Sequence, residues 1–326
     1  MPPRASVVVP AFNAERSIGQ CLSALAAQTC PAGSYEVIVV DDGSTDATGE
    51  IARKFPIKYI RQDNAGPATA RNRGAKEAAG EIILFTDSDC VPEPGWIEQM
   101  TRPFADPAVV AVKGAYGAGQ EGLTARFAQV EFEERFEMLK KAESIDMVDT
   151  YSAAFRSSDF RETGGFDQSF PHANNEDTDL SYKLSAAGKK MVFNPDAKVK
   201  HLGHPGSPWK YARLKFWRGY WRMVVYKRHP GKMVKDTYTP QTLKLQIALI
   251  FAAAGLGALC PVSHPAGWAS LVLLIAFAAS TVPFTIFAFR RDAAVGALAP
   301  AFLALRAAAI GCGILYYMAG AKAGRD

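Results

Sequence analysis

Short apolar runs alternate with helical patterns over the N-terminal part of the chain. Residues 6–9, 36–40 and 81–86 are largely apolar stretches, with polar residues only at their ends, that predict buried strands. A helix is predicted from Glu15 through Leu25, between the first two strands. This alternation predicts an α/β fold with a Rossmann-like, mostly parallel sheet, whose strand-end loops meet at one edge.

Pairs of carboxylates follow two of these strands. Asp87-Ser88-Asp89 comes after the third strand, and Asp41-Asp42 comes after the second. Residues at the carboxyl ends of strands face the crevice where open α/β sheets bind ligands. Two such carboxylates can bind Mg²⁺ or Mn²⁺, whose remaining positions hold a diphosphate. Turns and helix caps use the same residue types, so a purely structural role is the alternative.

Glycine and proline open a further helix before the third strand, at Gly66-Pro67. The N-terminus of a helix presents backbone amides to an anion. Arg71 and Arg73 lie near this end, and we expect only one of them to face the crevice. A pair of solvent-exposed arginines is the alternative.

Two later features add titratable groups. Glu176-Asp177 stands at the start of a helix predicted through Ala187. His201 follows a strand predicted at residues 191–193. A histidine at a strand end is either a structural hydrogen-bonding residue or a metal ligand, and the sequence leaves both open.

The chain changes character after His204. Residues 209–228 interleave Lys and Arg with Trp, Tyr and Phe at helical spacing and contain no acid. This pattern is typical of a helix on an anionic membrane surface, although a solvent-exposed basic helix is the alternative. No recognisable nucleic-acid-binding module accompanies the basic residues, so we expect no nucleic-acid partner.

Three apolar segments follow, at residues 247–262, 268–289 and 295–320. The first two predict a transmembrane hairpin closed by residues 263–265. The third contains Arg306, which is costly in a membrane unless it faces protein, water or a lipid phosphate. We expect three spans, with two spans plus an interfacial helix as the alternative. The basic residues before the hairpin place the N-terminal domain in the cytoplasm by the positive-inside rule.

Composition and cysteine usage indicate the cellular compartment. The chain has 326 residues, a formal net charge of +5 and five scattered cysteines without a Cys-x-x-Cys pair. This cysteine usage predicts a reducing compartment and no structural zinc. We expect no secretory signal, because the first strand starts close to the N-terminus. The predicted domains are residues 1–205, a basic membrane-interface segment at 206–242 and a membrane region at 243–326.

Six motifs, taken together, resemble the family 2 glycosyltransferases of the GT-A fold. In chain order they are Pro10-Ala11-Phe12-Asn13, Val40-Asp41-Asp42-Gly43-Ser44-Thr45-Asp46, residues 66–74, Asp87-Ser88-Asp89, Gly164-Gly165-Phe166-Asp167 and Asn175-Glu176-Asp177-Thr178-Asp179-Leu180-Ser181. The resemblance implies a GT-A catalytic domain, here of a membrane-anchored bacterial type.

The resemblance also implies a role for each matched position. Donor-binding residues would be Pro10, Phe12, Glu15, Asp41, Asp42, Arg71, Asp87 and Ser88. The Mg²⁺ or Mn²⁺ ligands would be Asp89, Asp87 and His201. Asp177 would be the general base with Glu176 in support, and Gly164, Gly165 and Phe166 would lie on the acceptor side.

The chemistry can be argued without the family. A sugar hydroxyl is a poor nucleophile, and a carboxylate that takes its proton contributes about 10²–10⁴-fold to the rate. The departing diphosphate develops negative charge, which a metal ion and an arginine stabilise. The family resemblance adds inversion at the anomeric carbon.

The expected activity is that of a metal-dependent, inverting glycosyltransferase, hexosyltransferase-like, of class EC 2.4. The donor would be a UDP- or GDP-sugar. The acceptor would be a hydroxyl of a lipid-linked sugar, a glycolipid or a surface polysaccharide of the cell envelope. The protein would be a multi-pass protein of the inner membrane, with its catalytic domain facing the cytoplasm, and a homo-oligomer is compatible with the sequence.

Two alternatives remain. A polyprenyl-phosphate sugar synthase would attack with an ionised phosphate and need no base, so the intact Glu176-Asp177 favours a hydroxyl acceptor. The alternative from another class is a non-catalytic membrane scaffold that retains the nucleotide site.

Overall fold

The computed structural model describes residues 3–31, 33–170 and 174–321. The chain divides into two compact units. The first unit comprises Met1–Gly119 and Met138–Gly203, and the second comprises Gln120–Glu137 and His204–Asp326. Each unit is described by itself below.

Within the described residues, eight strands of the first unit form one sheet in the order β3-β2-β1-β4-β7-β6-β8-β5. Strands β3, β2, β1 and β4 run parallel, as do β6 and β8, whereas β7 and β5 pair antiparallel with their neighbours. The strand bounds are β1 Ala5–Ala11, β2 Tyr35–Asp41, β3 Lys58–Arg61, β4 Ile82–Phe85, β5 Cys90–Pro92, β6 Val109–Ala118, β7 Ala153–Arg156 and β8 Lys190–His201. The predicted α/β fold with a mostly parallel sheet is confirmed.

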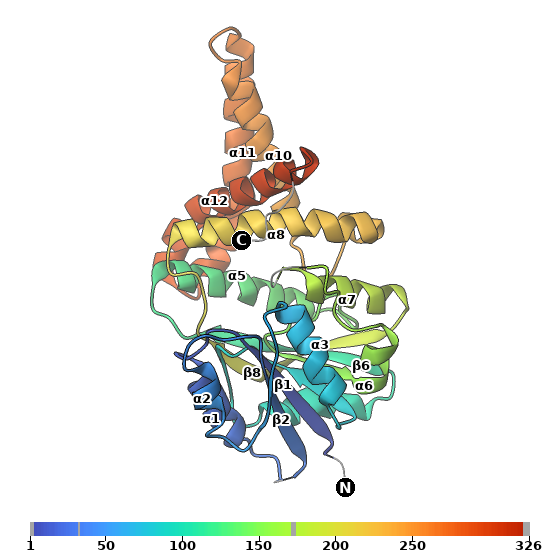
Figure 1. Cartoon of the computed structure of the whole chain (residues 1–326). Coiled ribbons are helices and arrows are strands. Elements are labelled where there is room, and N and C mark those ends of the chain that lie inside the picture. Colours follow the sequence, from blue (N-terminus) through green and yellow to red (C-terminus); the bar gives the residue numbers. More distant parts are fainter. Residues whose placement is uncertain (1–2, 32, 171–173, 322–326) are drawn as a thin grey trace. The chain divides into compact units, whose positions relative to one another are not determined.

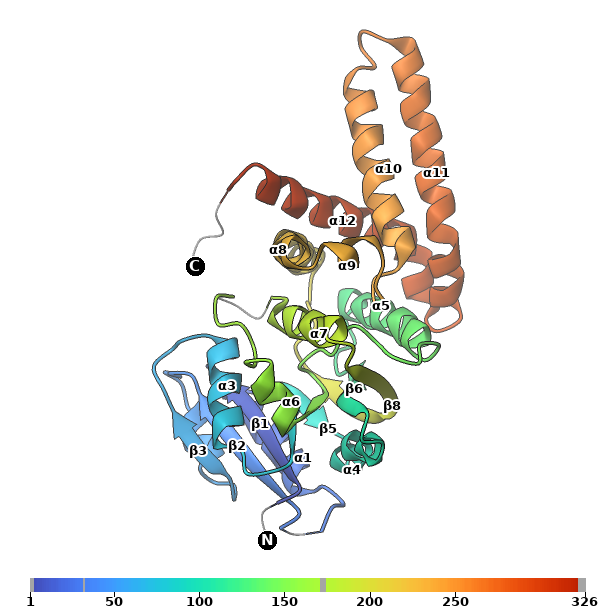
Figure 2. The same ribbon diagram turned by 90° about the vertical axis from the view of Figure 1, so that its right-hand side faces the viewer.

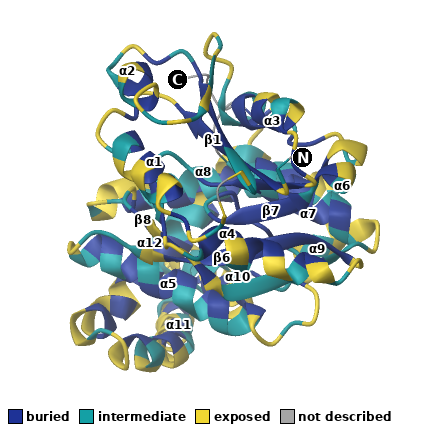
Figure 3. Cartoon of the chain, turned by 90° about the horizontal axis from the view of Figure 1, so that it is seen from below, coloured by how far each residue is buried: buried dark blue, intermediate teal, exposed yellow. Residues whose placement is uncertain are grey.

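The helices of this unit fill the connections between strands (Figure 1). They are α1 Ile18–Ala26, α2 Thr48–Ala52, α3 Pro67–Glu77, α4 Trp96–Thr101, the 3₁₀ helix Arg102–Ala105, α6 Ser157–Glu162 and α7 Glu176–Ala186. Gly74 lets α3 pack closely on the sheet, because a Cβ at this position would clash with the side chain of Val8 on β1. The strands beneath are apolar, and β1 is buried along its whole length (Figure 3).

Several predicted bounds shift by a few residues. The first strand is longer than residues 6–9, and residues 191–193 belong to a single long strand that ends at His201. The first helix begins at Ile18, so the predicted start at Glu15 is wrong. Glu15 lies in the preceding loop, where its backbone N–H donates to Asp46 and its carboxylate accepts from the backbone N–H of Ala47.

The second unit is helical. Its members are α5 Leu123–Leu139, α8 Pro208–Arg228, α9 Pro230–Val234, α10 Gln241–Ala258, α11 His264–Phe289 and α12 Ala293–Met318. Within the described chain, α10, α11 and α12 are long and apolar enough to cross a membrane, with mean hydropathies of 1.3, 2.3 and 1.9. The apolar segments expected from the sequence therefore form helices, with α10 beginning earlier than predicted.

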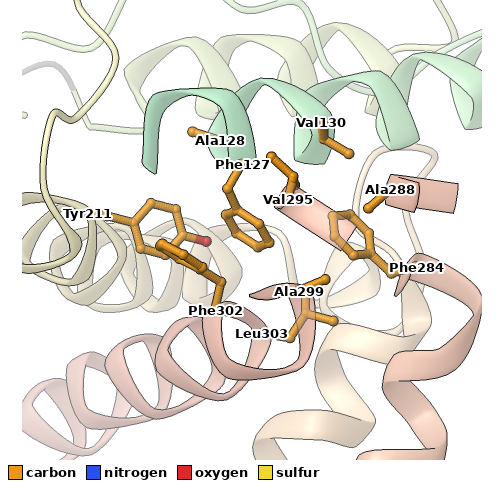
Figure 4. Close-up of a cluster of buried hydrophobic side chains, with 10 residues drawn as sticks. All are labelled: Phe127, Ala128, Val130, Tyr211, Phe284, Ala288, Val295, Ala299, Phe302 and Leu303. Atoms are coloured by element: carbon orange, nitrogen blue, oxygen red, sulfur yellow. The ribbon is translucent and has the colours of Figure 1, made fainter. Parts of the chain in front are cut away.

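Helix α5 groups with the C-terminal helices although it lies between β6 and β7 in the sequence. Phe127 of α5 stacks on Phe302 of α12 with ring centroids 4.5 Å apart and packs edge-on against Tyr211 of α8. This apolar cluster joins α5, α8, α11 and α12 (Figure 4). Neither α5 nor its place in this unit was identified from the sequence.

Candidate active site

The acidic turn after β4 brings Asp89 beside His201. β5 starts directly after Asp89 and pairs antiparallel with β8, in a register that sets Cys90 opposite His201. Asp89 Oδ2 therefore lies 3.4 Å from His201 Nε2, although the two residues are far apart in sequence. His201 is buried, and its ring packs edge-on against Tyr151 at 4.7 Å between centroids.

A glycine makes room for this pair. A Cβ at Gly203 would overlap the Asp89 carboxylate and lie 3.2 Å from His201 Nε2. Gly203 and Tyr151 were not identified from the sequence. No local motif surrounds either residue, and both are revealed by their contacts with Asp89 and His201 in the structure.

These residues form an arrangement suited to a divalent cation. Ligand atoms of Asp89, Cys90 and His201 all lie within 4.8 Å of one another. Burial raises the pKa of the Cys90 thiol, as do Asp87 and Asp89, so the thiol stays protonated and is a poor ligand. A carboxylate with an imidazole suits Mn²⁺ better than Mg²⁺, which prefers oxygen ligands. The donor set fits the metal expected from the sequence.

Arg71 connects three elements of the first unit. It is 2 % exposed on α3, and its guanidinium donates to Asp87 Oδ1 after β4 and to Glu176 Oε1 on α7, both at 2.7 Å. Arg73 is exposed and lies 3.7 Å from Glu77. Only one arginine of the pair is therefore directed inward. Asp87, expected as a donor and metal residue, engages Arg71 with one carboxylate oxygen in this structure.

Glu176 is buried against Arg71 at the start of α7. Burial and the neighbouring Asp177 raise the pKa of Glu176 to about 7, while Arg71 opposes this shift. Its second oxygen, Oε2, has no hydrogen-bond partner among the described residues. Glu176 can therefore accept one more hydrogen bond or form an ion pair with a cation.

Asp177 lies in the first turn of α7, as predicted. The helix follows Asn175, whose φ of 66° is in the left-handed region. Asp177 Oδ1 accepts from the backbone N–H of Thr178 at 2.6 Å. The carboxylate is half-buried, and with Glu176 and Asp87 it gives this region an excess of acids around a single arginine.

The acids after β2 hold the neighbouring loops in place. Asp41 accepts from the backbone N–H of Ser44 at 2.8 Å and from the Tyr59 hydroxyl, and these bonds lower its pKa although burial would raise it. Asp42 accepts from Gln62 at 2.8 Å and from the backbone N–H of Gly66 at 2.8 Å. The Asp42 contact thus ties the loop after β2 to the start of α3.

The other residues expected at the donor side differ in accessibility. Phe12 is 51 % exposed after β1, whereas Pro10 is buried in that strand. Ser88 lies in the turn after β4 and is half-buried. The expected donor contacts of all these residues remain predictions.

The glycine loop expected on the acceptor side is held by Asn72 of α3. Gly164 and Gly165 have φ values of 82° and 71°, which favour glycine. Asn72 donates to the Phe166 carbonyl at 2.7 Å and accepts from its backbone N–H at 2.9 Å. The Phe166 ring is buried against Phe85, at 5.2 Å between centroids, so the ring itself serves the core.

Comparison with known proteins finds similarity over the N-terminal part of the chain. Residues 6–164 match the profile "Glycosyl transferase family 2". The chain is 39 % identical over 118 residues to Glycosyltransferase AglE of Haloferax volcanii, covering 34 % of this chain and 39 % of that protein. It is 28 % identical over 264 residues to Pre-mycofactocin glycosyltransferase of Mycobacterium tuberculosis, covering 78 % and 54 %. The chain thus spans about half or less of the length of these relatives.

Among solved structures, the mannosyltransferase PcManGT from Pyrobaculum calidifontis, in complex with GDP-Man and Mn²⁺, has a similar fold. The TM-score is 0.68 at 20 % identity, over 99 % of this chain and 89 % of that one. S. aureus TarS 1–349, in complex with UDP-GlcNAc, matches with a TM-score of 0.50 at 19 % identity, over 98 % and 92 %. The GT-A-like fold is therefore shared with glycosyltransferases.

Proposed function

Because residues 6–164 belong to glycosyl transferase family 2, we propose that this glycosyltransferase transfers a sugar, with inversion, from a nucleoside diphosphate to a hydroxyl of a membrane-associated acceptor. The observation that carries the proposal is the group of acids after β4 and at the start of α7 around one buried arginine. An excess of carboxylates over cations favours a bound divalent metal and, through it, a diphosphate.

Separate residues would bind the metal ion and the donor. Asp89 and His201 would hold Mn²⁺ or Mg²⁺, which when bound would offset the charge of the leaving diphosphate. Asp87 would lie next to this metal and face the donor. The loops shaped by Asp41 and Asp42 would hold the nucleoside.

Asp177 would take the proton from the acceptor hydroxyl. Glu176 and Arg71 would keep it in place, because Arg71 links the start of α7 to the donor-side Asp87. Arg71 donates two of its N–H groups to these carboxylates. We therefore assign it a positioning role rather than a direct contact with the diphosphate. The glycine loop at Gly164 and Gly165 would border the acceptor.

The acceptor is proposed to be lipid-linked or part of an envelope glycan, because three candidate membrane helices follow the catalytic unit. The sequence and the fold are compatible with either a UDP- or a GDP-sugar, and both kinds of donor occur in the similar structures.

The test is a transfer assay on the full-length protein in detergent. UDP-glucose, UDP-N-acetylglucosamine and GDP-mannose would each be supplied with Mn²⁺ and a total membrane lipid extract. We expect one donor to be consumed and its sugar to appear on a lipid with inverted anomeric configuration. Asp177→Asn should slow transfer by about 10²–10⁴-fold, whereas Asp196→Asn, at an exposed position of β8, should leave it unchanged.

The product also separates the proposal from its main alternative. Mild acid releases a sugar attached directly to a polyprenyl phosphate as a free monosaccharide, whereas a sugar transferred to a hydroxyl stays joined to its acceptor by a glycosidic bond. Release of the transferred sugar as a monosaccharide would replace the hydroxyl acceptor by a phosphate. If protein shown to be folded transfers no sugar from any donor, the scaffold alternative is favoured and the proposal fails.

A further inference from the structure

Within the second unit, three helices run crosswise to the α10–α11 hairpin. The hairpin extends away from the rest of the unit, while α5, α8 and α12 lie across its base in both side views (Figures 1 and 2). Helix α12 is long and apolar enough to span a membrane, yet it does not run alongside the hairpin.

The start of α12 is fixed to α5 by ion pairs. Asp292, which caps α12, accepts two hydrogen bonds from Arg126 of α5 at 2.6 Å each. Arg291, which precedes Asp292, lies 2.8 Å from Glu133, which is also on α5. The apolar cluster of Figure 4 then packs Val295 and Phe302 of α12 against α5.

The middle of α12 is fixed by a buried charge cluster. Arg306 is 1 % exposed and donates to Glu131 of α5 at 3.0 Å and to Gln246 of α10 at 2.9 Å. Glu131, which is fully buried, also accepts from the Tyr211 hydroxyl at 2.7 Å and lies 2.9 Å from Lys215 Nζ, both on α8.

This cluster shows how a charged Arg306 is accommodated in an otherwise apolar helix. Burial alone would raise the pKa of Glu131, but Lys215, Arg306 and Arg135 lower it, so the carboxylate stays charged. Arg306 therefore faces protein, in the form of a carboxylate contributed by α5.

The second half of α12 crosses α8 at two glycines. A Cβ at Gly219 of α8 would clash with the carbonyl of Ile310, and a Cβ at Gly313 of α12 would clash with that of Phe216. Beyond the crossing, Tyr316 packs on Phe216 with ring centroids 5.6 Å apart. Helix α12 thus contacts α5 or α8 from its cap to its last turn.

Neither α5 nor α8 can lie at the centre of a bilayer. Helix α5 carries Arg126, Glu131, Glu133, Glu134, Arg135 and Glu137, and α8 is basic along its length. Residues 119–122 join β6 to α5, and residues 202–207 join β8 to α8. Extended linkers of four and six residues reach about 14 Å and about 21 Å, less than the ~30 Å of a hydrocarbon core. Both helices must therefore stay on the side of the membrane where the sheet lies.

We propose that α12 lies in the membrane interface, parallel to the bilayer plane, so that the chain crosses the membrane only twice, through α10 and α11. Spanning by α12 would carry Arg306 to mid-bilayer and pull α5 or α8 with it, because their contacts cover its whole length. The C-terminus then returns to the side of the catalytic unit, and this topology goes beyond the proposed function.

The partner of the outer face of α12 is a leaflet of lipid. Its exposed positions carry no charge and include Leu298, Cys312, Leu315 and Met318. An apolar outer face over a charged, aromatic inner layer is the pattern of a helix at the headgroup boundary. Tryptophans and tyrosines of α8 supply the interfacial aromatics, with Trp209 the most exposed.

The test is the sidedness of single cysteines in sealed membrane vesicles that contain the full-length protein. Cys260 lies exposed in the turn between α10 and α11, and Cys21 and Cys90 are buried and can remain. In a Cys30→Ser, Cys312→Ala background, three proteins would be compared: one keeping Cys260, and two with Cys260→Ser combined with Ala319→Cys or Asp196→Cys.

A membrane-impermeant maleimide should label the Ala319→Cys and Asp196→Cys proteins from the same side, and Cys260 from the opposite side. If Ala319→Cys is labelled from the side that labels Cys260, α12 spans and the proposal is wrong. Both positions are exposed, so the substitutions leave folding intact.

Spin labels give a second readout that does not depend on sealed vesicles. Labels introduced by Leu298→Cys, Ala301→Cys and Met318→Cys, and on native Cys312, should all report a similar shallow depth. A steady gradient of depth along α12, or a maximum near its middle, would contradict an in-plane helix. Neither readout requires transfer activity, so failure of the proposed function would leave this topology standing, and the reverse also holds.

Discussion

Each unit of this chain buries charged groups, but the two clusters are built in opposite ways. In the first unit, one arginine, Arg71, pairs with two carboxylates, with Asp177 close by. In the helical unit, one carboxylate, Glu131, is surrounded by Lys215 and Arg306 at hydrogen-bond distance. The first cluster has an excess of acids and the second an excess of bases.

The difference teaches how to separate a binding site from a structural ion cluster. Glu176 keeps an oxygen without a hydrogen-bond partner among the described residues, and its pKa is raised, so added positive charge would be favourable there. Both oxygens of Glu131 have partners, and its pKa is lowered. Burial of charge is common to both clusters, whereas only the first can gain from a metal or a ligand.

The largest expected effect is on the proposed base. Asp177→Asn should lower kcat by about 10²–10⁴-fold, because the acceptor hydroxyl loses its proton acceptor. Donor affinity should stay close to that of the wild type, since the substitution leaves Asp89, His201 and the nucleoside loops intact. Single-turnover kinetics with the preferred donor would measure both quantities. A nearly unchanged kcat would remove Asp177 from the mechanism.

In the helical unit, Glu131→Gln should lower the free energy of unfolding by about 3–5 kcal/mol, because buried Lys215 and Arg306 lose the carboxylate that they share. The measurement is chemical unfolding in detergent. Glu137→Gln is the matched control, because the Glu137 carboxylate lies 3.5 Å from the partly exposed Arg291. This substitution should cost less than about 1 kcal/mol. Equal effects of the two substitutions would show that the cluster is not structural.

The pH dependence of the free energy of unfolding should report the titration of Glu176. The pKa of Glu176 is raised in the folded state, so its favourable contribution is complete below its ordinary pKa and is lost as the pH rises through about 7. Glu176→Gln should therefore gain up to about 3 kcal/mol relative to the wild type between pH 4.5 and 8 in donor-free protein. Thermal unfolding of both proteins across this range would measure the gain, and a pH-independent difference would contradict it.

The smallest effect concerns a single hydroxyl. Tyr211→Phe removes the hydrogen bond to charged Glu131 but keeps the ring in the apolar cluster, which should cost about 1.5–3 kcal/mol. Tyr35→Phe is the control, since its hydroxyl donates to the neutral carbonyl of Leu25, and it should cost about 0.5–1.5 kcal/mol. If Tyr35→Phe costs as much as Tyr211→Phe, the charge of Glu131 adds nothing to the bond.

Strands β1, β2 and β4 were predictable from the sequence because they are largely apolar runs, whereas β3, β5, β6 and β7 were not identified. The acids at their ends were predictable for the same reason, since a strand end is visible locally. The partners of those acids were not. Arg71 and Glu176 are 105 residues apart, and no local pattern links them.

The place of α5 was hidden by the same kind of distance. The sequence around Glu131 gives no local sign of burial, and contacts with residues far along the chain, such as Arg306 175 residues away, explain why this glutamate is fully buried. The same contact changes the interpretation of α12. From composition, α12 is a third span, whereas its contacts with α5 and α8 support the proposed in-plane position.

The most direct test of the central claim is metal-dependent binding of a nucleoside diphosphate to the full-length protein. UDP and GDP would each be added with Mn²⁺ or with EDTA, and thermal unfolding recorded for the wild type and Asp89→Ala. We expect one nucleotide, at 100 times its Kd, to stabilise the wild type by about 2.7 kcal/mol, only with Mn²⁺ and not in Asp89→Ala. Equal stabilisation with EDTA, or none with either nucleotide, would contradict a metal-dependent donor site at Asp89.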